Sequence, residues 1–338
     1  MHFLITGHTG FKGAWLTMLL RSRGHEVSGI SLPPENDSLY NYASLKKQLI
    51  FEYFKDIRNR EDLLKAFSKI GPDYVIHLAA QPLVRESYKD PITTYESNIV
   101  GTFNVLESIR LTNSIKSALI ITTDKVYRNI GKKTGYVESD PLGGLDPYSA
   151  SKAAADLVTQ SWISSLEKIP LGIARAGNVI GGGDWAKDRI IPDFVRTIQN
   201  RQKLIIRYPH AIRPWQHVLD CLNGYLQMIE YMTTKKESLT LNFGPEADSA
   251  KSVLDLINEC ENHWGIKSQI ELSEIDRMKE SDVLLLDSTK ARTLLNWNDK
   301  LNFVESVKFT MDFYKRHASG ENAALIMQDQ ISTYEKMN

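Results

Sequence analysis

The sequence predicts an α/β fold: a doubly wound parallel sheet with a smaller, mixed α/β C-terminal lobe. Two observations support this. Through the first half of the chain, short apolar runs alternate with amphipathic segments, as in repeated strand–helix–strand units. Three glycines, Gly7, Gly10 and Gly13, follow the first apolar run in "FLITGHTGFKG" and open the first amphipathic segment. Glycines placed between a strand and a helix are typical of a dinucleotide-binding sheet.

The elements of the sheet domain follow from these patterns in chain order. "YVIHLAA" is an almost unbroken apolar run, suited to a strand buried on both faces. The expected strands are residues 2–6, 26–32, 50–57, 74–80 and 117–123, and the expected helices are residues 13–24, 60–70, about 93–110 and one starting near Ser149.

The regular alternation weakens after "LGIARAGNVIG", where a glycine-rich, irregular stretch begins. We therefore expect residues 1–175 to form a dinucleotide-binding domain, interleaved with a substrate lobe over residues 176–318. Residues 319–338 are more polar, and we expect a loosely held tail there.

Composition narrows the class of protein. The chain has 338 residues, of which 42% are apolar, so it can bury a substantial core. Lys+Arg and Asp+Glu both total 41, which gives no net field toward nucleic acid or a membrane. Cys221 and Cys260 form neither a disulfide framework nor a metal-binding spacing. With neither a leader pattern nor a long apolar span, we expect a cytoplasmic protein without metal.

The glycine loop predicts a pyrophosphate site. Its glycines would allow a tight turn, close backbone approach to phosphate and close packing of helix on sheet, while the helix N-terminus supplies free N–H groups. An ordinary glycine-rich turn is the alternative. His8 and Lys12 lie between the glycines. We expect them either to adjust cofactor affinity or to be solvent-facing and without consequence.

The end of the second strand bears on the choice of cofactor. A carboxylate commonly binds the adenosine ribose there, but this chain has Ser31 and Leu32. No basic pair follows that could hold a 2′-phosphate, so we expect NAD. Asp56 and Ile57, ending the third strand, are either adenine contacts or a solvated strand end.

A tyrosine and a lysine lie four residues apart in "PYSASKAAAD". Tyr148 and Lys152 would share one face of a helix, one turn apart. A nearby ammonium favours the phenolate and can bring the tyrosine pKa toward the working pH. Such a tyrosine can take a proton from a substrate hydroxyl while hydride leaves the same carbon. The pair alone is also common on ordinary helices; the glycine loop favours the catalytic interpretation.

A third group of polar residues ends the strand "LIITTDKVY". Thr122, Thr123, Asp124 and Lys125 would lie at the carboxyl end of a parallel strand, which opens onto the ligand crevice. A charged turn is the alternative. Because the Tyr–Lys helix comes next in the chain, we expect these residues to face a substrate.

These strings together resemble the extended short-chain dehydrogenase/reductases, and within them the nucleotide-sugar 4,6-dehydratases, the CDP-glucose group above all. The resemblance runs from residue 6 to about 218 and is weaker to about 315. It rests on "TGHTGFKG", "HLAAQPLVRESY", "DKVY", "DPLGGLDPYSASK", "RAGNVIGGGDWAKDRIIPD" and "RPWQHV".

The resemblance implies a Rossmann-type fold and an NAD-mediated cycle: oxidation at C4 of CDP-glucose, loss of water across C5 and C6, and return of hydride to C6. Tyr148 would be the C4 hydroxyl base, tuned by Lys152, and Thr123 would steady the sugar. Asp124 would be the acid for the C6 hydroxyl. Lys125, where the dTDP-glucose relatives have glutamate, would be or position the C5 base.

The resemblance also implies binding residues. The implied cofactor contacts are Gly7, Gly10, Phe11, Lys12, Gly13, Ser31, Asp56, Ile57, Leu78, Ala79, Ala80, Asn98, Thr122, Tyr148 and Lys152. The implied substrate contacts are Gln81, Ser87, Asn178, Arg189 and Arg213. After "DKVY" the segment "RNIGKKTGYVESD" is shorter and more basic than in the CDP-glucose group, which leaves the exact base and sugar open.

Two other functions use part of the same motifs. A nucleotide-sugar 4-epimerase needs the glycines, Tyr148 and Lys152 but has no elimination step for Asp124 and Lys125 to serve. A catalytically idle NAD-binding scaffold would not require Tyr148 and Lys152. The resemblance further implies a homodimer joined by a four-helix bundle, built from the helices that start near Thr93 and Ser149.

Overall fold

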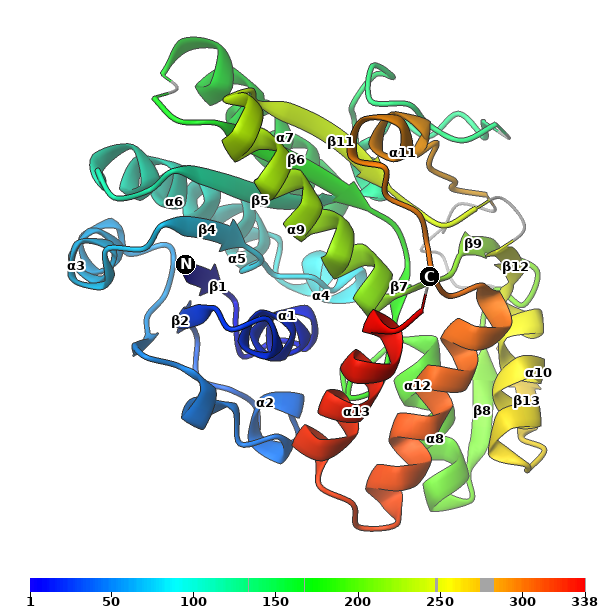
Figure 1. Ribbon diagram of the computed structural model, residues 1–338. Helices are drawn as coiled ribbons and strands as arrows, with labels where there is room; N and C mark the ends of the chain where they lie inside the picture. The colour runs from blue at the N-terminus through cyan, green and yellow to red at the C-terminus, as the bar shows by residue number, and fades with distance from the viewer. Residues whose placement is uncertain (133, 167, 247–248, 274–282, 338) are drawn as a thin grey trace.

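A seven-stranded parallel sheet lies at the centre of the molecule (Figure 1). The computed structural model describes residues 1–132, 134–166, 168–246, 249–273 and 283–337. The strand order is β11–β6–β5–β4–β1–β2–β3, and every neighbouring pair is parallel, which confirms the predicted doubly wound α/β fold. The strands are β1 (His2–Thr6), β2 (Glu26–Ser31), β3 (Glu52–Phe54), β4 (Tyr74–His77), β5 (Ser117–Thr123), β6 (Leu171–Ala176) and β11 (Leu239–Phe243).

Helices cover both faces of the sheet, as Figure 1 shows. Side chains alternate along each strand, so Phe3 and Ile5 of β1 enter one apolar core while Leu4 enters the other. Both faces of the sheet are therefore buried, which explains the unbroken apolar runs in the sequences of its strands. One face carries α1 (Phe11–Ser22) and α9 (Val218–Lys235), and the other carries α3 (Arg60–Ile70), α6 (Gly101–Leu111) and α7 (Pro147–Ser165).

The sheet takes its last strand from beyond residue 175. β11 pairs with β6 in register, with Leu239 opposite Gly172 and Phe243 opposite Ala176. Helix α9, which precedes β11, packs on the same core as α1. The chain thus returns to the sheet after entering the second lobe, and a boundary at residue 175 cuts through the sheet.

The second lobe consists of helices and short two-stranded sheets. It lies against the carboxyl ends of the central strands. β7 pairs with β10, β8 with β13 and β9 with β12. The elements are β7 (Val179–Ile180), α8 (Ile190–Asn200), β8 (Lys203–Ile206), β9 (Ile212–Pro214), β10 (Gln216–His217), β12 (Ala250–Ser252), α10 (Val253–Trp264), β13 (Gln269–Leu272), α11 (Thr289–Leu295) and α12 (Phe303–Ala318).

The prediction of a loosely held tail over residues 319–338 is wrong. Helix α13 (Ala323–Glu335) forms there and packs on α1 and α12. Its tyrosine Tyr334 donates a hydrogen bond of 2.9 Å to the buried Asp220 of α9. The polar residues that suggested a tail form the outer face of an amphipathic helix. The buried face is Ala323, Ile326, Met327, Gln330, Ile331 and Tyr334.

The helix predicted for residues 93–110 is a composite of three segments. A π-helical turn, η2 (Glu96–Val100), separates α5 (Pro91–Tyr95) from α6. No helix in the described part of the chain is both long and apolar enough to cross a membrane. The remaining short helices are α2 (Leu39–Tyr42), η1 (Leu45–Gln48), α4 (Val84–Lys89) and η3 (Asp124–Val126).

Candidate active site

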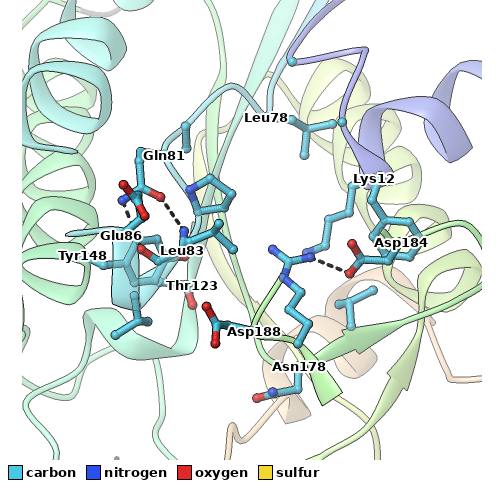
Figure 2. A pocket seen from close by; sticks show the side chains of 18 of the residues that line it. Lys12, Leu78, Gln81, Leu83, Glu86, Thr123, Tyr148, Asn178, Asp184 and Asp188 are labelled. Atoms are coloured by element: carbon cyan, nitrogen blue, oxygen red, sulfur yellow. Dashed lines mark hydrogen bonds and ion pairs between the residues drawn. The ribbon is translucent and has the colours of Figure 1, made fainter. Parts of the chain in front are cut away.

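A cavity of about 790 Å³ opens at the carboxyl ends of the sheet strands. Loops that follow β1 to β6 line it on the sheet side, and the start of α8, the end of β8 and β9 line it on the side of the second lobe. This is the crevice in which doubly wound sheets bind ligands. In Figure 2, Lys12 lies on one side of the cavity, and Tyr148 and Thr123 lie on the other.

The glycine loop has the shape that a pyrophosphate requires. Gly7 has a φ of +81°, and a Cβ there would lie 2.7 Å from the amide nitrogen of Ala79. A Cβ on Gly13 would lie 2.2 Å from the carbonyl oxygen of Gly7. Gly10 is the N-cap of α1, and no described side chain caps the helix there. The free N–H groups and the positive dipole end of α1 therefore fit the pyrophosphate of a dinucleotide.

His8 and Lys12 have different environments. The His8 ring is buried and fills the space over Gly29, where a Cβ would lie 2.4 Å from the ring. Its Nε2 lies 2.8 Å from Glu52 Oε1. Among the described residues of the cavity wall, His8 is absent and Lys12 is present. The loop histidine is therefore neither solvent-facing nor directed at a cofactor, and only Lys12 is placed to contact one.

The cavity wall also contains the predicted residues at the ends of β2 and β3. Ser31 Oγ lies 2.6 Å from Thr9 Oγ1, and both residues line the cavity. Asp56 also lines it, but Arg58 holds that carboxylate at 2.7 Å and lowers its pKa. Ile57 packs against Gly101, where a Cβ would lie 2.5 Å from its Cδ1. Phe11 of α1 and three residues after β4 complete the wall: Leu78, Ala79 and Ala80.

Helix α7 presents Tyr148 and Lys152 to the cavity. Asp146 caps the helix by accepting a hydrogen bond of 2.9 Å from Ser149 N, which places Tyr148 in the first turn. One turn later Lys152 is 6% exposed, and its ammonium donates a hydrogen bond of 2.8 Å to the carbonyl of Ile121. The helix thus brings both predicted residues to the end of β5.

The protonation of this pair differs from the expectation that Lys152 lowers the tyrosine pKa. Burial raises the pKa of Tyr148 to about 12, and the charge of Asp124 adds to this effect. The hydroxyl of Thr123 and the guanidinium of Arg189 oppose it. Burial also lowers the pKa of Lys152 to about 8, because a cation loses hydration there.

The end of β5 brings three predicted residues together. Thr123 Oγ1 donates a hydrogen bond of 2.8 Å to Asp124 Oδ1, and Lys125 Nζ lies 3.6 Å from the same oxygen. Asp124 is fully buried, and within the described chain its Oδ2 has no hydrogen-bond partner. A Cβ on Gly177, which lines the cavity, would lie 3.4 Å from that oxygen. Thr122, Thr123 and Lys125 line the cavity, and Asp124 lies directly behind it.

Two predicted contacts lie behind the wall and support residues on it. Ser87 is buried, and its hydroxyl accepts a hydrogen bond of 3.1 Å from Tyr148 N. Asn98, in the π-helical turn, accepts from Gln81 N at 2.8 Å and donates to Ser151 Oγ at 2.9 Å. Neither belongs to the described cavity wall, so this structure gives them a supporting place.

The other predicted substrate contacts line the cavity: Gln81, Asn178, Arg189 and Arg213. Asn178 Oδ1 is buried without a hydrogen-bond partner among the described residues. Arg189 forms an ion pair of 2.7 Å with Asp184, drawn in Figure 2, and this carboxylate raises the arginine pKa. Arg213 is also buried and donates a hydrogen bond to the carbonyl of Ile212.

Sequence reasoning missed an ion-pair group on the same wall. Asp188 Oδ1 lies 3.1 Å from Arg207 NH1 and 3.8 Å from Arg85 Nε, and all three residues line the cavity. The two arginines are more than a hundred residues apart, so no local pattern connects them. The one local signal was Asp188 itself, beside the predicted Arg189 in "KDRIIPD".

The family follows from comparison of the whole chain with known proteins. A family model described as GDP-mannose 4,6 dehydratase matches residues 4–310. The chain belongs to the GDP-mannose 4,6 dehydratase family. A family relative, the CDP-glucose 4,6-dehydratase of Salmonella typhimurium, is 40% identical over 98% of this chain and 95% of its own length. These findings confirm the resemblance to the nucleotide-sugar 4,6-dehydratases.

Solved structures share the fold of this family member. The UDP-glucuronic acid 4-epimerase of Bacillus cereus, in complex with UDP-glucuronic acid and NAD, is 25% identical with a TM-score of 0.82. It covers 94% of this chain and 100% of its own. The UDP-glucose-4-epimerase of Stenotrophomonas maltophila is 19% identical with a TM-score of 0.84, over 95% and 100% of the two chains.

Proposed function

We propose that the protein is an NAD-dependent nucleotide-sugar 4,6-dehydratase that converts CDP-glucose to CDP-4-keto-6-deoxyglucose. The observation that supports this most directly is the meeting of two groups at one strand end. Tyr148 and Lys152 reach the cavity from α7. Thr123 and Lys125 line the same place at and after the end of β5, with Asp124 directly behind them. Oxidation at C4 needs the tyrosine and lysine of α7. Elimination of water also needs an acid and a base, which the residues at the end of β5 would supply. The Salmonella relative has the same reaction in its name.

The chain's own residues take these roles as follows. Bound NAD would supply the hydride acceptor for C4 and the hydride donor for C6. Tyr148 takes the proton of the C4 hydroxyl, and Thr123 and Arg189 favour its phenolate. Lys152, held by the carbonyl of Ile121, would orient the cofactor ribose.

The elimination is assigned to the end of β5. Asp124 would protonate the leaving C6 hydroxyl through its unpartnered Oδ2, which lies behind the cavity wall at Gly177. Lys125 lines the cavity with its Nζ 3.6 Å from Asp124 Oδ1. As a neutral amine it would take the C5 proton itself, and as an ammonium it would position the base that takes it. Asn178, Arg189 and Arg213 would hold the sugar nucleotide, with the guanidinium groups on the diphosphate.

Incubation of the purified protein with CDP-glucose and NAD tests the function. We expect a 4-keto-6-deoxy sugar, identified by mass and NMR, without net accumulation of NADH. Formation of CDP-galactose would instead show a 4-epimerase. A parallel panel of dTDP-, GDP- and UDP-glucose should give slower turnover than CDP-glucose, and a faster member of the panel would replace CDP-glucose as the substrate.

We also propose that two copies associate through α6 and α7. The outer faces of these helices and of η2 carry exposed apolar side chains, including Val100, Phe103 and Leu157. Phe103 contacts Trp162 edge-on, with ring centroids 5.4 Å apart, which joins the two helices into one surface. Pairing this surface with its copy would form a four-helix bundle and cover the apolar groups.

Analytical ultracentrifugation tests the dimer. Wild-type protein should sediment as a dimer at micromolar concentration, and Phe103→Glu should shift it to monomer because a carboxylate would be buried in the bundle. Leu325→Glu, on the exposed face of α13, is the matched control and should remain dimeric. A monomeric wild-type protein would contradict the proposal.

A cytoplasmic location is our further proposal, because Cys221 and Cys260 are both buried and unpaired. Cell fractionation should recover the protein with soluble cytoplasmic markers. Recovery in the periplasmic or membrane fraction would contradict this location.

A further inference from the structure

A buried ion pair behind the cavity has no role in the scheme above. Arg175 of β6 and Asp156 of α7 are 1% and 0% exposed. The guanidinium donates to both carboxylate oxygens, from Nε to Oδ2 and from NH2 to Oδ1, each at 2.8 Å. A well-packed apolar pair of similar size is often no less stable than a buried ion pair. Stability alone therefore does not explain why these charges are there.

The position of Asp156 connects it to the catalytic helix. Tyr148, Lys152 and Asp156 succeed one another at intervals of one helical turn on α7, so they share a face. Lys152 donates to the carbonyl of Ile121, and Asp156 Oδ2 accepts a hydrogen bond of 3.1 Å from Thr122 Oγ1. Consecutive residues of β5 thus hold the lysine and the aspartate.

Arg175 extends the same network to the segment that follows Lys125. Its NH1 donates a hydrogen bond of 2.9 Å to the hydroxyl of Tyr127, which lies two residues after Lys125. Tyr127 in turn donates to Asn242 Oδ1 of β11 at 2.6 Å. One buried pair therefore connects α7, β5, β6 and β11 directly beneath the cavity.

The charges that face Lys152 come from three elements. Lys12 approaches from α1 and His77 from β4, and Asp156 lies on α7 itself. Burial and Lys12 both disfavour the ammonium form, whereas the carboxylate of Asp156 favours it. His77 is held in the neutral form by burial, so it adds no positive charge near neutral pH.

We propose that Asp156, fixed by Arg175, is a positioning residue that keeps Lys152 charged and in place for the cofactor. This rests on the proposed function only in the choice of NAD as the partner of Lys152. The carboxylate touches neither substrate nor cofactor. Asp156 acts through Lys152 and through its hydrogen bond with Thr122. The two hydrogen bonds from Arg175 fix the position of its carboxylate.

The pH dependence of lysine acetylation tests this without substrate or cofactor. Acetic anhydride reacts with the neutral amine, so the labelling rate of Lys152, read by peptide mass spectrometry, follows its titration. In wild-type protein the midpoint should lie near the lysine pKa of about 8. In the double variant Asp156→Asn/Arg175→Gln, which avoids an unpaired buried charge, it should move to lower pH, because the carboxylate that favours the ammonium form is lost.

NAD affinity gives a second reading. If Lys152 must be charged to hold the cofactor, the alkaline loss of NAD binding should move to lower pH by the same amount in the double variant. The matched control is Glu107→Gln/Arg110→Gln, which removes an ion pair of 2.7 Å from α6, outside the site. It should leave both midpoints unchanged.

Asp156→Glu keeps the carboxylate, so it still tests the proposal if the double variant does not fold. Its labelling midpoint should stay close to the wild-type value, because the charge remains beside the lysine. An acid shift in Asp156→Glu as large as that in the double variant would overturn the proposal, as would an unchanged midpoint in the folded double variant. Since labelling needs no CDP-glucose, these outcomes stand apart from failure of the proposed reaction.

Discussion

Tyr148 illustrates how burial sets the chemistry of one residue. Its pKa is raised to about 12, and the groups that oppose this, Thr123 and Arg189, both belong to the cavity. A tyrosine in this environment is protonated near neutral pH. To act as the base it needs further groups that favour the phenolate, in addition to Thr123 and Arg189.

Tyr148→Phe should reduce turnover of CDP-glucose by roughly 10²–10⁴-fold, because the base for the C4 hydroxyl is lost. NAD affinity should be retained, since the ring and its backbone contact with Ser87 remain. Steady-state kinetics and an NAD titration measure the two effects. Tyr88→Phe, an exposed position on α4, is the control and should be fully active. Wild-type turnover in Tyr148→Phe would refute the role.

His8 and Lys12 should separate into a structural and a ligand-facing residue. His8→Ala removes the buried partner of Glu52, and we expect it to lower the free energy of unfolding by about 1–3 kcal/mol. Lys12→Ile should change stability by no more than about 0.5 kcal/mol but alter NAD affinity, because this side chain lines the cavity. Urea unfolding and NAD titration distinguish them, and equal destabilisation by both would contradict the assignment.

At the scale of the element, α13 shows that a polar segment can be part of the core. Its apolar residues are spaced for one helical face, and the neighbouring helices α1 and α12 cover that face. Asp220 of α9 accepts a hydrogen bond from the hydroxyl of Tyr334, which ties α13 to α9. The helix thus fixes α1, whose N-terminus forms the glycine loop.

Adjacent residues of α13 provide a matched test. Ile326→Ala should lower the free energy of unfolding by about 2–5 kcal/mol, because Ile326 is fully buried and its loss leaves a cavity. Leu325→Ala should cost less than about 0.5 kcal/mol, because Leu325 is 58% exposed. Chemical denaturation of both variants measures the difference. Similar values for the two would show that the segment is held loosely after all.

At the scale of the whole molecule, buried histidines should make the fold sensitive to acid. Burial lowers the pKa of His77 and of His217 to about 3. Between about pH 6.5 and pH 3 these histidines are protonated in the unfolded chain but neutral in the folded protein. The free energy of unfolding is therefore unaffected by them above about pH 6.5 and decreases as pH falls toward 3. Asp220 has the opposite effect, because burial raises its pKa to about 7. Its contribution to the free energy of unfolding decreases as pH rises toward 7, since the unfolded chain loses this proton first.

His77→Gln should flatten this acid dependence. Each histidine that stays neutral in the folded protein lowers the free energy of unfolding by about 1.4 kcal/mol for every pH unit below its unfolded pKa. The drop in unfolding free energy between pH 7 and pH 5 should therefore be about 2 kcal/mol smaller in the variant than in wild type. Urea unfolding at both pH values measures it, with the exposed His210→Gln as the control. The same drop in wild type and His77→Gln would refute the prediction.

Much of the fold and part of the site could be predicted because their signals are local. The glycines, Tyr148 with Lys152, and the end of β5 each lie within one turn or one strand end, and the parallel sheet brings such ends to one edge. Ser87 and Asn98 lie in motifs of the same kind but are directed behind the wall. A motif specifies the position of a backbone segment and leaves the direction of each side chain open.

The sequence by itself determined the alternation of strands and helices and the glycine loop, because periodicity and spacing act over short distances, and its motifs carried the resemblance to the family. Only the tertiary structure decided that His8 is buried on Gly29, that α13 is core, and that Arg175 clamps Asp156 beneath Lys152. It also decided that Arg85 and Arg207 meet Asp188 on the cavity wall. These contacts join residues far apart in the chain, so they exist only once the sheet and the second lobe have packed.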